Sequence, residues 1–190
     1  MSAATRITAG EWRGRVIETP RGLRIRPTRS LTRQSLFNIL GPQIEDMTVL
    51  DLYAGAGTVG FEALSRGAAS ATFVDRDRVP LACIAATAER FGSGDRCHTV
   101  RSDVAAWLRR NPATVAGADL AFVDAPYRDA ELDATLQLLG AHPPALVVCE
   151  HHSKRRLPEH IGALERARET RHGLTTLTFL RRSTDGADAA

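Results

Sequence analysis

Residues 51–60 combine an acidic residue with three glycines in a spacing that suits a ligand-binding turn. Gly55, Gly57 and Gly60 satisfy the pattern GxGxxG, in which the backbone turns sharply from a strand into a helix and comes close to a bound group. Asp51 lies four residues before the first glycine. A pyrophosphate gains nothing from that negative charge, whereas a ligand with a cationic amino group is attracted to it.

Two further acids end the next two apolar runs. Asp75 closes SATFVD, where a carboxylate can accept hydrogen bonds from both ribose hydroxyls of an adenosine. Asp103, in RSDV, is then placed to bind the adenine amino group, with Val104 beside the ring. These acids indicate an adenosine ligand. Asp75 does not distinguish between cofactor classes, because a dinucleotide would need the same residue.

The acid and glycine loop resemble the first motif of the class I S-adenosylmethionine-dependent methyltransferases. The resemblance implies S-adenosyl-L-methionine as cofactor and S-adenosyl-L-homocysteine as its product. The cofactor contacts that we expect are Asp51, Tyr53, Ala54, Gly55, Gly57, Asp75, Arg76, Asp103 and Val104.

A second motif, Asp124-Ala125-Pro126-Tyr127, follows the fourth apolar run. It resembles the Asp/Asn-Pro-Pro-aromatic motif of methyltransferases that act on exocyclic amines, with Ala125 in place of the first proline. Such an amine is a poor nucleophile, so Asp124 and the carbonyl of Ala125 would accept its two N–H groups and aim the nitrogen lone pair. Tyr127 would stack on the flipped base, and Pro126 would shape the turn. We expect these four residues to be catalytic.

The elements that must position these residues alternate in type from Met47 onward. Apolar runs that predict strands cover 48–53, 70–75, 96–101, 119–124 and 145–150, and helical patterns cover 58–65, 79–91, 104–109 and 130–139. Residues 163–170 and 174–180 predict an antiparallel pair at one edge. The fold class is therefore α/β, a Rossmann-like, mostly parallel seven-stranded sheet with an antiparallel edge pair.

The N-terminal part does not follow this alternation. Residues 6–9 and 15–19 predict a small β-hairpin that carries Trp12, which we expect to anchor the hairpin, and residues 31–40 predict a helix. The expected division is a hairpin extension at 1–30 that binds RNA, a methyltransferase domain at 31–183 and a frayed tail at 184–190.

Charge is distributed unevenly along the 190 residues, whose formal net charge is +3. Residues 1–33 carry a net +6, residues 34–150 a net −6 and residues 151–190 a net +3, which suggests a surface for a polyanion beside a different kind of site.

The three cysteines are widely spaced, and Cys149, His151 and His152 lack a fourth ligand, so we expect no metal. There is no signal-peptide core or membrane-length apolar run, which predicts a cytoplasmic protein.

Nearly the whole chain resembles the RsmD family of bacterial enzymes that methylate the N2 amine of one guanine in small-subunit (16S) rRNA. The segments that carry the resemblance are RITAGEWRGR, IRPT with RQSLFNIL, DLYAGAGTVGFEALSRGA and FVDAPY. It implies 16S rRNA as partner, within a 30S subunit or an assembly intermediate, and we expect a monomer that does not bind membranes. The RNA contacts that we expect are Arg6, Arg13, Arg15, Arg26, Arg29 and Arg33.

Three alternatives stay open at this point. Adenine-N6 methylation of DNA or RNA would use the same tetrapeptide. An NAD-dependent oxidoreductase would explain GxGxxG and Asp75 but leave Asp51 without a task. A non-catalytic RNA-binding protein would explain the basic ends alone.

Overall fold

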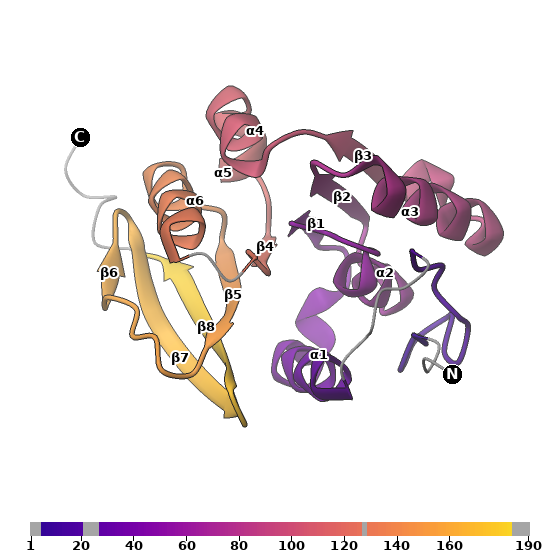
Figure 1. Cartoon of the computed structure of the whole chain (residues 1–190), viewed down its shortest axis with the longest axis horizontal. Coiled ribbons are helices and arrows are strands. Elements are labelled where there is room, and N and C mark those ends of the chain that lie inside the picture. Colours follow the sequence, from indigo (N-terminus) through magenta and orange to yellow (C-terminus); the bar gives the residue numbers. More distant parts are fainter. Residues whose placement is uncertain (1–4, 21–26, 127–128, 184–190) are drawn as a thin grey trace.

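The computed structural model describes residues 5–20, 27–126 and 129–183, and for residues 27–29 and 129 the backbone alone. Within these residues eight strands form one sheet (Figure 1). The strands are β1 (Thr48–Leu52), β2 (Ser70–Asp75), β3 (Cys97–Arg101), β4 (Leu120–Val123), β5 (Leu146–His152), β6 (His160–Ile161), β7 (Leu164–His172) and β8 (Thr175–Arg182). The helices are α1 (Pro27–Leu40), α2 (Thr58–Ser65), α3 (Arg78–Phe91), α4 (Val104–Arg110), α5 (Pro112–Ala116) and α6 (Asp129–Ala141), with short 3₁₀ turns η1 (Gly41–Ile44) and η2 (Gly94–Arg96).

The order of the strands places a switch in winding direction between β1 and β4. Across the sheet the order is β3-β2-β1-β4-β5-β8-β7-β6. The first five strands in this order are parallel, and β8, β7 and β6 continue the sheet in antiparallel pairs. In open α/β sheets a ligand binds outside the carboxyl ends of the strands where the winding reverses, so the ends of β1 and β4 are the expected place for a site.

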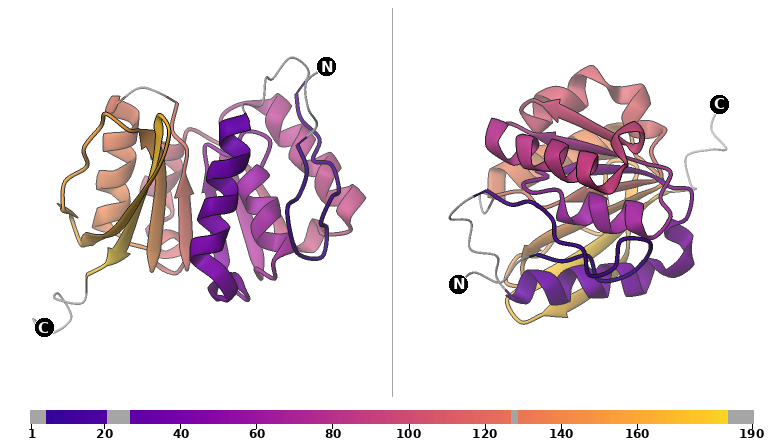
Figure 2. Two further views of the ribbon diagram at one scale, coloured as in Figure 1. Left: turned by 90° about the horizontal axis from the view of Figure 1, so that it is seen from below. Right: turned by 90° about the vertical axis from the view of Figure 1, so that its right-hand side faces the viewer.

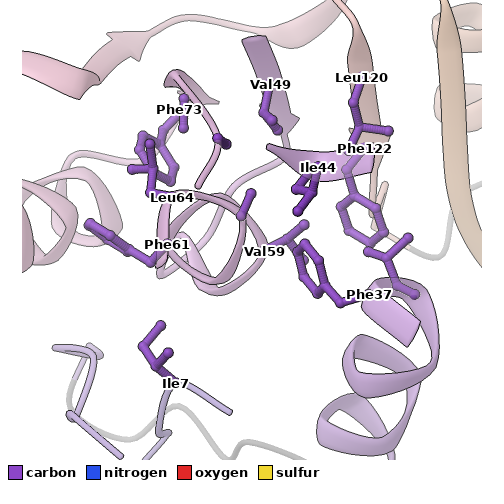
Figure 3. Close-up of a cluster of buried hydrophobic side chains, with 14 of the residues drawn as sticks. Ile7, Phe37, Ile44, Val49, Val59, Phe61, Leu64, Phe73, Leu120 and Phe122 are labelled. Carbon is purple, nitrogen blue, oxygen red and sulfur yellow. The ribbon is translucent and has the colours of Figure 1, made fainter. Parts of the chain in front are cut away.

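Helices cover both faces of the sheet because the parallel strands are apolar on both sides. One core joins α1, α2 and α3 to the sheet and includes Phe37, Phe61 and Phe73 (Figure 3). A second core, on the other face, holds Trp107 of α4 and Leu136 of α6. The predicted strands and helices of residues 48–150 are confirmed, and the predicted bounds of α2 and β2 match those observed.

The predicted N-terminal β-hairpin is wrong. Residues 5–20 make one isolated antiparallel bridge, between Arg6 and Val16, and no strand. The segment lies across α2 (Figure 2): Ile7, Trp12 and Ile17 are buried in the first core. An isolated two-stranded hairpin is only marginally stable, and here the apolar side chains of the segment are covered by packing against the domain.

Two other features differ from those expected. The sheet has eight strands rather than seven, because the two-residue strand β6 adds to the edge beside β7. Helix α1 begins at Pro27, not at Leu31, since proline is well accommodated in the first turn of a helix. The expected tail at 184–190 lies outside the described residues.

No helix in the described part of the chain is long and apolar enough to cross a membrane.

Candidate active site

The glycine loop joins the end of β1 to the first turn of α2, and its glycines have two different tasks. A Cβ on Gly60 would lie 2.3 Å from the Phe73 ring, and one on Gly57 would lie 2.9 Å from it. These two residues are therefore glycines because helix α2 packs directly on β2. Gly55 has a φ of +53°, and a Cβ there would meet no atom within 4 Å, so its backbone faces open space in which a ligand could approach.

Asp51 is held by this loop in a buried position. Its carboxylate is 3% exposed and accepts a hydrogen bond of 2.9 Å from the backbone amide of Gly60. Burial raises the pKa of Asp51 from 3.8 to about 8, against the opposing effect of the Gly60 hydrogen bond and with smaller contributions from the nearby Asp124 and Asp75. A cationic ligand group close by would favour the charged form of this carboxyl.

Asp75 at the end of β2 organises the same loop from the other side. One carboxylate oxygen accepts the amide of Gly55 at 2.8 Å, and the other accepts the amide of Asp77 at 2.9 Å. Each oxygen keeps a second lone pair. The carboxylate can therefore orient the loop and still accept hydroxyl groups from a ligand.

A cavity of about 230 Å³ opens beside Asp75 at the carboxyl ends of the strands. Its described lining includes five of the expected cofactor residues: Tyr53, Asp75, Arg76, Asp103 and Val104. Asp103 also caps α4 by accepting the amide of Ala106 at 2.8 Å. Asp51, Ala54, Gly55 and Gly57 lie in the adjoining loop and are not part of this lining. The fold thus brings expected cofactor residues from three strand ends to one hollow.

Tyr53 is fixed in this wall by a contact with α6. Its hydroxyl lies 2.7 Å from the hydroxyl of Thr135, and burial raises the pKa of Tyr53. The ring therefore has a set position at the mouth of the loop, and no pattern in the sequence indicated its partner on α6.

A second cavity, of about 380 Å³, lies on the other side of the residues that follow β4. Asp124 and Pro126 line both cavities, and Ala125 lines the second. The opposite wall comes from the end of β5 and the following loop, with His152 and Lys154 among its residues. Asp124 therefore lies between the cavity beside Asp75 and the second cavity. Tyr127 lies outside the described residues.

Sequence reasoning did not identify the wall that β5 contributes. From the sequence, His151 and His152 are considered only as metal ligands. The one available signal was that β5 follows β4 in a parallel sheet, so that their carboxyl ends meet. Among the residues described, no three His, Cys, Asp or Glu side chains gather as a metal site would require.

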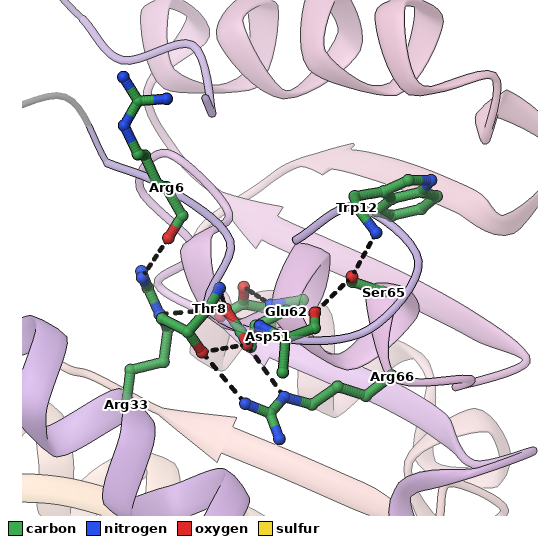
Figure 4. Close-up of polar contacts among 10 residues, drawn as sticks. Arg6, Thr8, Trp12, Arg33, Asp51, Glu62, Ser65 and Arg66 are labelled. Carbon is green, nitrogen blue, oxygen red and sulfur yellow. Dashed lines mark hydrogen bonds and ion pairs between the residues drawn. The ribbon is translucent and has the colours of Figure 1, made fainter. Parts of the chain in front are cut away.

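Glu62 on α2 makes a set of buried polar contacts that the sequence did not reveal. Its side chain is 0% exposed, forms ion pairs with Arg66 at 2.9 Å and Arg33 at 3.5 Å, and accepts the amide of Thr8 at 2.9 Å (Figure 4). Burial lowers the pKa of Arg33, and its guanidinium donates to the carbonyl of Arg6 at 2.7 Å. Glu62 thereby ties α1 and the N-terminal segment to the helix that follows the glycine loop.

The expected RNA-binding arginines divide into distinct groups. Arg6, Arg13 and Arg15 are exposed; Arg15 also lies 4.1 Å above the ring of Phe91. Arg33 is only 7% exposed and faces Glu62, so it has little surface to offer RNA. Arg26 lies outside the described residues, as does the side chain of Arg29.

Fold and site together define a class of protein. A Rossmann-like sheet with a glycine loop after β1, an acid after β2 and an Asp-Ala-Pro turn after β4 has the architecture of a class I, S-adenosylmethionine-dependent methyltransferase. The structure of a putative methyltransferase, yhhF, from Escherichia coli matches with a TM-score of 0.82 and 33% identity, over 95% of this chain and 99% of that chain.

The particular family follows from comparison with sequences. The family model described as Conserved hypothetical protein 95 matches residues 5–181. Ribosomal RNA small subunit methyltransferase D of Escherichia coli is 34% identical over 161 residues, 83% of this chain and 79% of that protein. The putative rRNA methyltransferase YlbH of Bacillus subtilis is 30% identical over 181 residues, 93% of this chain and 98% of that protein. The chain belongs to this family, the RsmD family of rRNA methyltransferases, which confirms the resemblance noted in the sequence.

Proposed function

We propose that the protein transfers a methyl group from S-adenosyl-L-methionine to the exocyclic N2 amine of a specific guanine in 16S rRNA. The observation that carries the proposal is the place of Asp124, which lines two cavities at once. One hollow would take the methyl donor and the other the base. Support for rRNA as substrate comes from the relatives named as small-subunit rRNA methyltransferases.

The cofactor would occupy the smaller cavity and the loop beside it. Asp75 would accept the ribose hydroxyls, and Asp103 with Val104 would bind the adenine. The carboxyl of Asp51 would lie near the amino group of the cofactor's methionine part. Arg76, Tyr53, Ala54, Gly55 and Gly57 complete the proposed contacts. When bound, the cofactor supplies an electrophilic sulfonium methyl group and leaves as a neutral thioether.

At the target amine, this chain's task is to hold the nitrogen and take up its proton. The carboxylate of Asp124 and the carbonyl of Ala125 would each accept one N–H, which directs the lone pair toward the donor methyl. The nitrogen gains a methyl group and a positive charge, which the carboxylate stabilises before one proton leaves. Pro126 would shape the turn, and Tyr127 would stack on the flipped base.

RNA would be held by the basic ends of the chain. We assign direct contacts to Arg6, Arg13 and Arg15, which are exposed, and keep Arg26 and Arg29 as proposed contacts. We assign Arg33 to packing on Glu62 rather than to RNA. On this view residues 1–30 bind RNA, residues 31–183 form the methyltransferase domain of a cytoplasmic monomer, and the substrate is a 30S subunit or an assembly intermediate.

The proposal is tested by methylation of ribosomal subunits from cells that lack the protein. With a labelled methyl donor, nucleoside mass spectrometry should find N2-methylguanine in 16S rRNA. Asp124→Ala should abolish transfer but leave binding of S-adenosyl-L-homocysteine intact, while Asp95→Asn, an exposed acid on η2, should change neither.

Labelled N6-methyladenine would support the adenine alternative, and binding of NAD(H) in place of S-adenosyl-L-homocysteine would support an oxidoreductase. RNA affinity with no methyl transfer to any subunit would leave a non-catalytic RNA-binding protein.

A further inference from the structure

The larger cavity has hydrogen-bond acceptors after β4 on one wall, and on the other wall donors together with the carboxylate of Glu150 at the end of β5. Asp124 and Ala125, after β4, provide a carboxylate and a carbonyl. His152 and Lys154, at the end of β5 and beyond it, face the same cavity. Since His152 and Lys154 are not among the residues that we assign to methyl transfer, they bear on which base the cavity accepts.

The hydrogen bonding of His152 determines which ring nitrogen carries the proton. The backbone amide of Lys154 donates to Nδ1 of His152 at 3.1 Å. A nitrogen that accepts a hydrogen bond is unprotonated, so the proton of the neutral ring is on Nε2. No described residue accepts a hydrogen bond from Nε2, which makes His152 a donor of fixed tautomer in the cavity wall.

The neighbouring histidine cannot serve in this way. Nδ1 of His151 contacts the carbonyl of His152 at 3.1 Å, and its Nε2 contacts the hydroxyl of Thr178 at 2.8 Å. Both nitrogens of His151 are thus engaged within the sheet. The exposed ammonium of Lys154 adds a positive charge to the donor wall and has no partner among the described residues.

The register of the sheet gives the span between the two walls. Val123 is paired with Cys149 in the parallel strands β4 and β5. Asp124 is one residue beyond this pair and His152 is three, which places His152 about 7 Å further along the strand direction. This offset is similar to the distance that a base would span if its edge were held between Asp124 and His152.

We propose that His152 is a specificity-determining residue that donates from Nε2 to O6 of the target guanine. The guanine edge carries the N2 amine and N1–H, both donors, and then O6, an acceptor. Asp124 and Ala125 would accept the two N–H groups of the amine, and His152 would donate to O6 at the far end of the same edge. When adenine presents its N6 amine to Asp124, the corresponding position on its edge is C2–H, which accepts nothing.

The inference rests on the proposed function and is tested with a base analogue. 2-Aminopurine keeps the 2-amine but lacks O6 and N1–H. Small subunits are reconstituted with 16S rRNA ligated around an oligonucleotide that carries either guanine or 2-aminopurine at the position that nucleoside mapping identifies. For each substrate, kcat/KM is measured for the unmodified protein, His152→Phe and His152→Gln.

His152→Phe should lower kcat/KM for guanine by about tenfold to a hundredfold, the size of a lost base contact, and leave 2-aminopurine nearly unchanged. His152→Gln keeps a donor and an acceptor for the Lys154 amide, so it should recover most of the activity on guanine. His98→Phe, at an exposed site on the far edge strand β3, is the matched control. Unchanged binding of S-adenosyl-L-homocysteine would show that the variants are folded.

The inference is overturned if His152→Phe affects both bases equally or neither, or if His152→Gln is as impaired on guanine as His152→Phe. Failure of the proposed function has a different signature. In that case the unmodified protein transfers no methyl group to the guanine substrate.

Discussion

The carboxylate of Asp51 accepts a buried hydrogen bond of 2.9 Å from the backbone amide of Gly60. This bond links the end of β1 to the first turn of α2. The bond closes the glycine loop across its two ends. Because the acid is buried, the loop contains a carboxyl group whose charge depends on pH near neutrality. Ionisation of the Asp51 carboxyl therefore acts on the hydrogen bond to Gly60 and, through it, on the shape of the proposed cofactor loop.

Asp51→Asn should change how stability depends on pH. In the unfolded chain Asp51 loses its proton near its usual pKa of 3.8, whereas in the fold it keeps the proton up to about 8. Between these values the folded state binds more protons than the unfolded state, so this residue lowers the free energy of unfolding as pH rises. Urea unfolding at pH 5 and pH 8 should show a smaller loss of stability in Asp51→Asn than in the unmodified protein. An equal loss in both would contradict the raised pKa.

Gly60→Ala should destabilise the fold by about 1–3 kcal/mol, because the added methyl group would overlap a fully buried ring. Its Cβ would lie 2.3 Å from Phe73, which is 0% exposed and cannot move aside. Gly94→Ala is the control, since a Cβ there meets nothing within 4 Å. Thermal unfolding should separate the two variants, and a Gly60→Ala protein as stable as the control would refute the close packing of α2 on β2.

Glu62→Gln should cost about 3–5 kcal/mol, the range for breaking a buried ion pair. The substitution keeps the shape of the side chain but leaves the buried guanidinium of Arg33 without its counter-charge. Glu89→Gln, an exposed site on α3, should have almost no effect. Denaturant titration measures both. Adding Arg33→Met to Glu62→Gln should restore part of the loss; if it does not, the ion pair is not the origin of the effect.

Charge reversal at Arg6 and Arg13 should weaken RNA binding without affecting the cofactor. Both side chains are exposed on the N-terminal segment, and each lost phosphate contact should reduce the slope of log affinity against log salt by about 0.7–0.9. Arg109→Glu with Arg110→Glu is the control, because both are exposed at the end of α4 on the other face of the sheet. Filter binding to 16S rRNA at several salt concentrations gives the slopes. Similar slopes for the two double variants would show that the N-terminal segment is not the RNA surface.

Some features of this protein were predictable because they depend on neighbours in the sequence. The central strands are largely apolar runs, and an acid at or just after the end of such a run, such as Asp75 or Asp124, must emerge at the carboxyl edge of a parallel sheet. The helix that follows the glycine loop is set by local pattern alone. The family resemblance was readable for the same reason, since each motif is contiguous.

Other features were decided by tertiary structure. Glu62 meets Thr8 and Arg33 only because the N-terminal segment and α1 fold back onto α2, and that burial removed the expected hairpin. His152 faces Asp124 only because β5 is placed beside β4. By itself the sequence determined which chemical groups stand at the strand ends, since side-chain alternation and turns are local. The partners of Glu62 and the two walls of the larger cavity required long-range pairing, because contacts between segments far apart in the chain leave no periodic signal in either one.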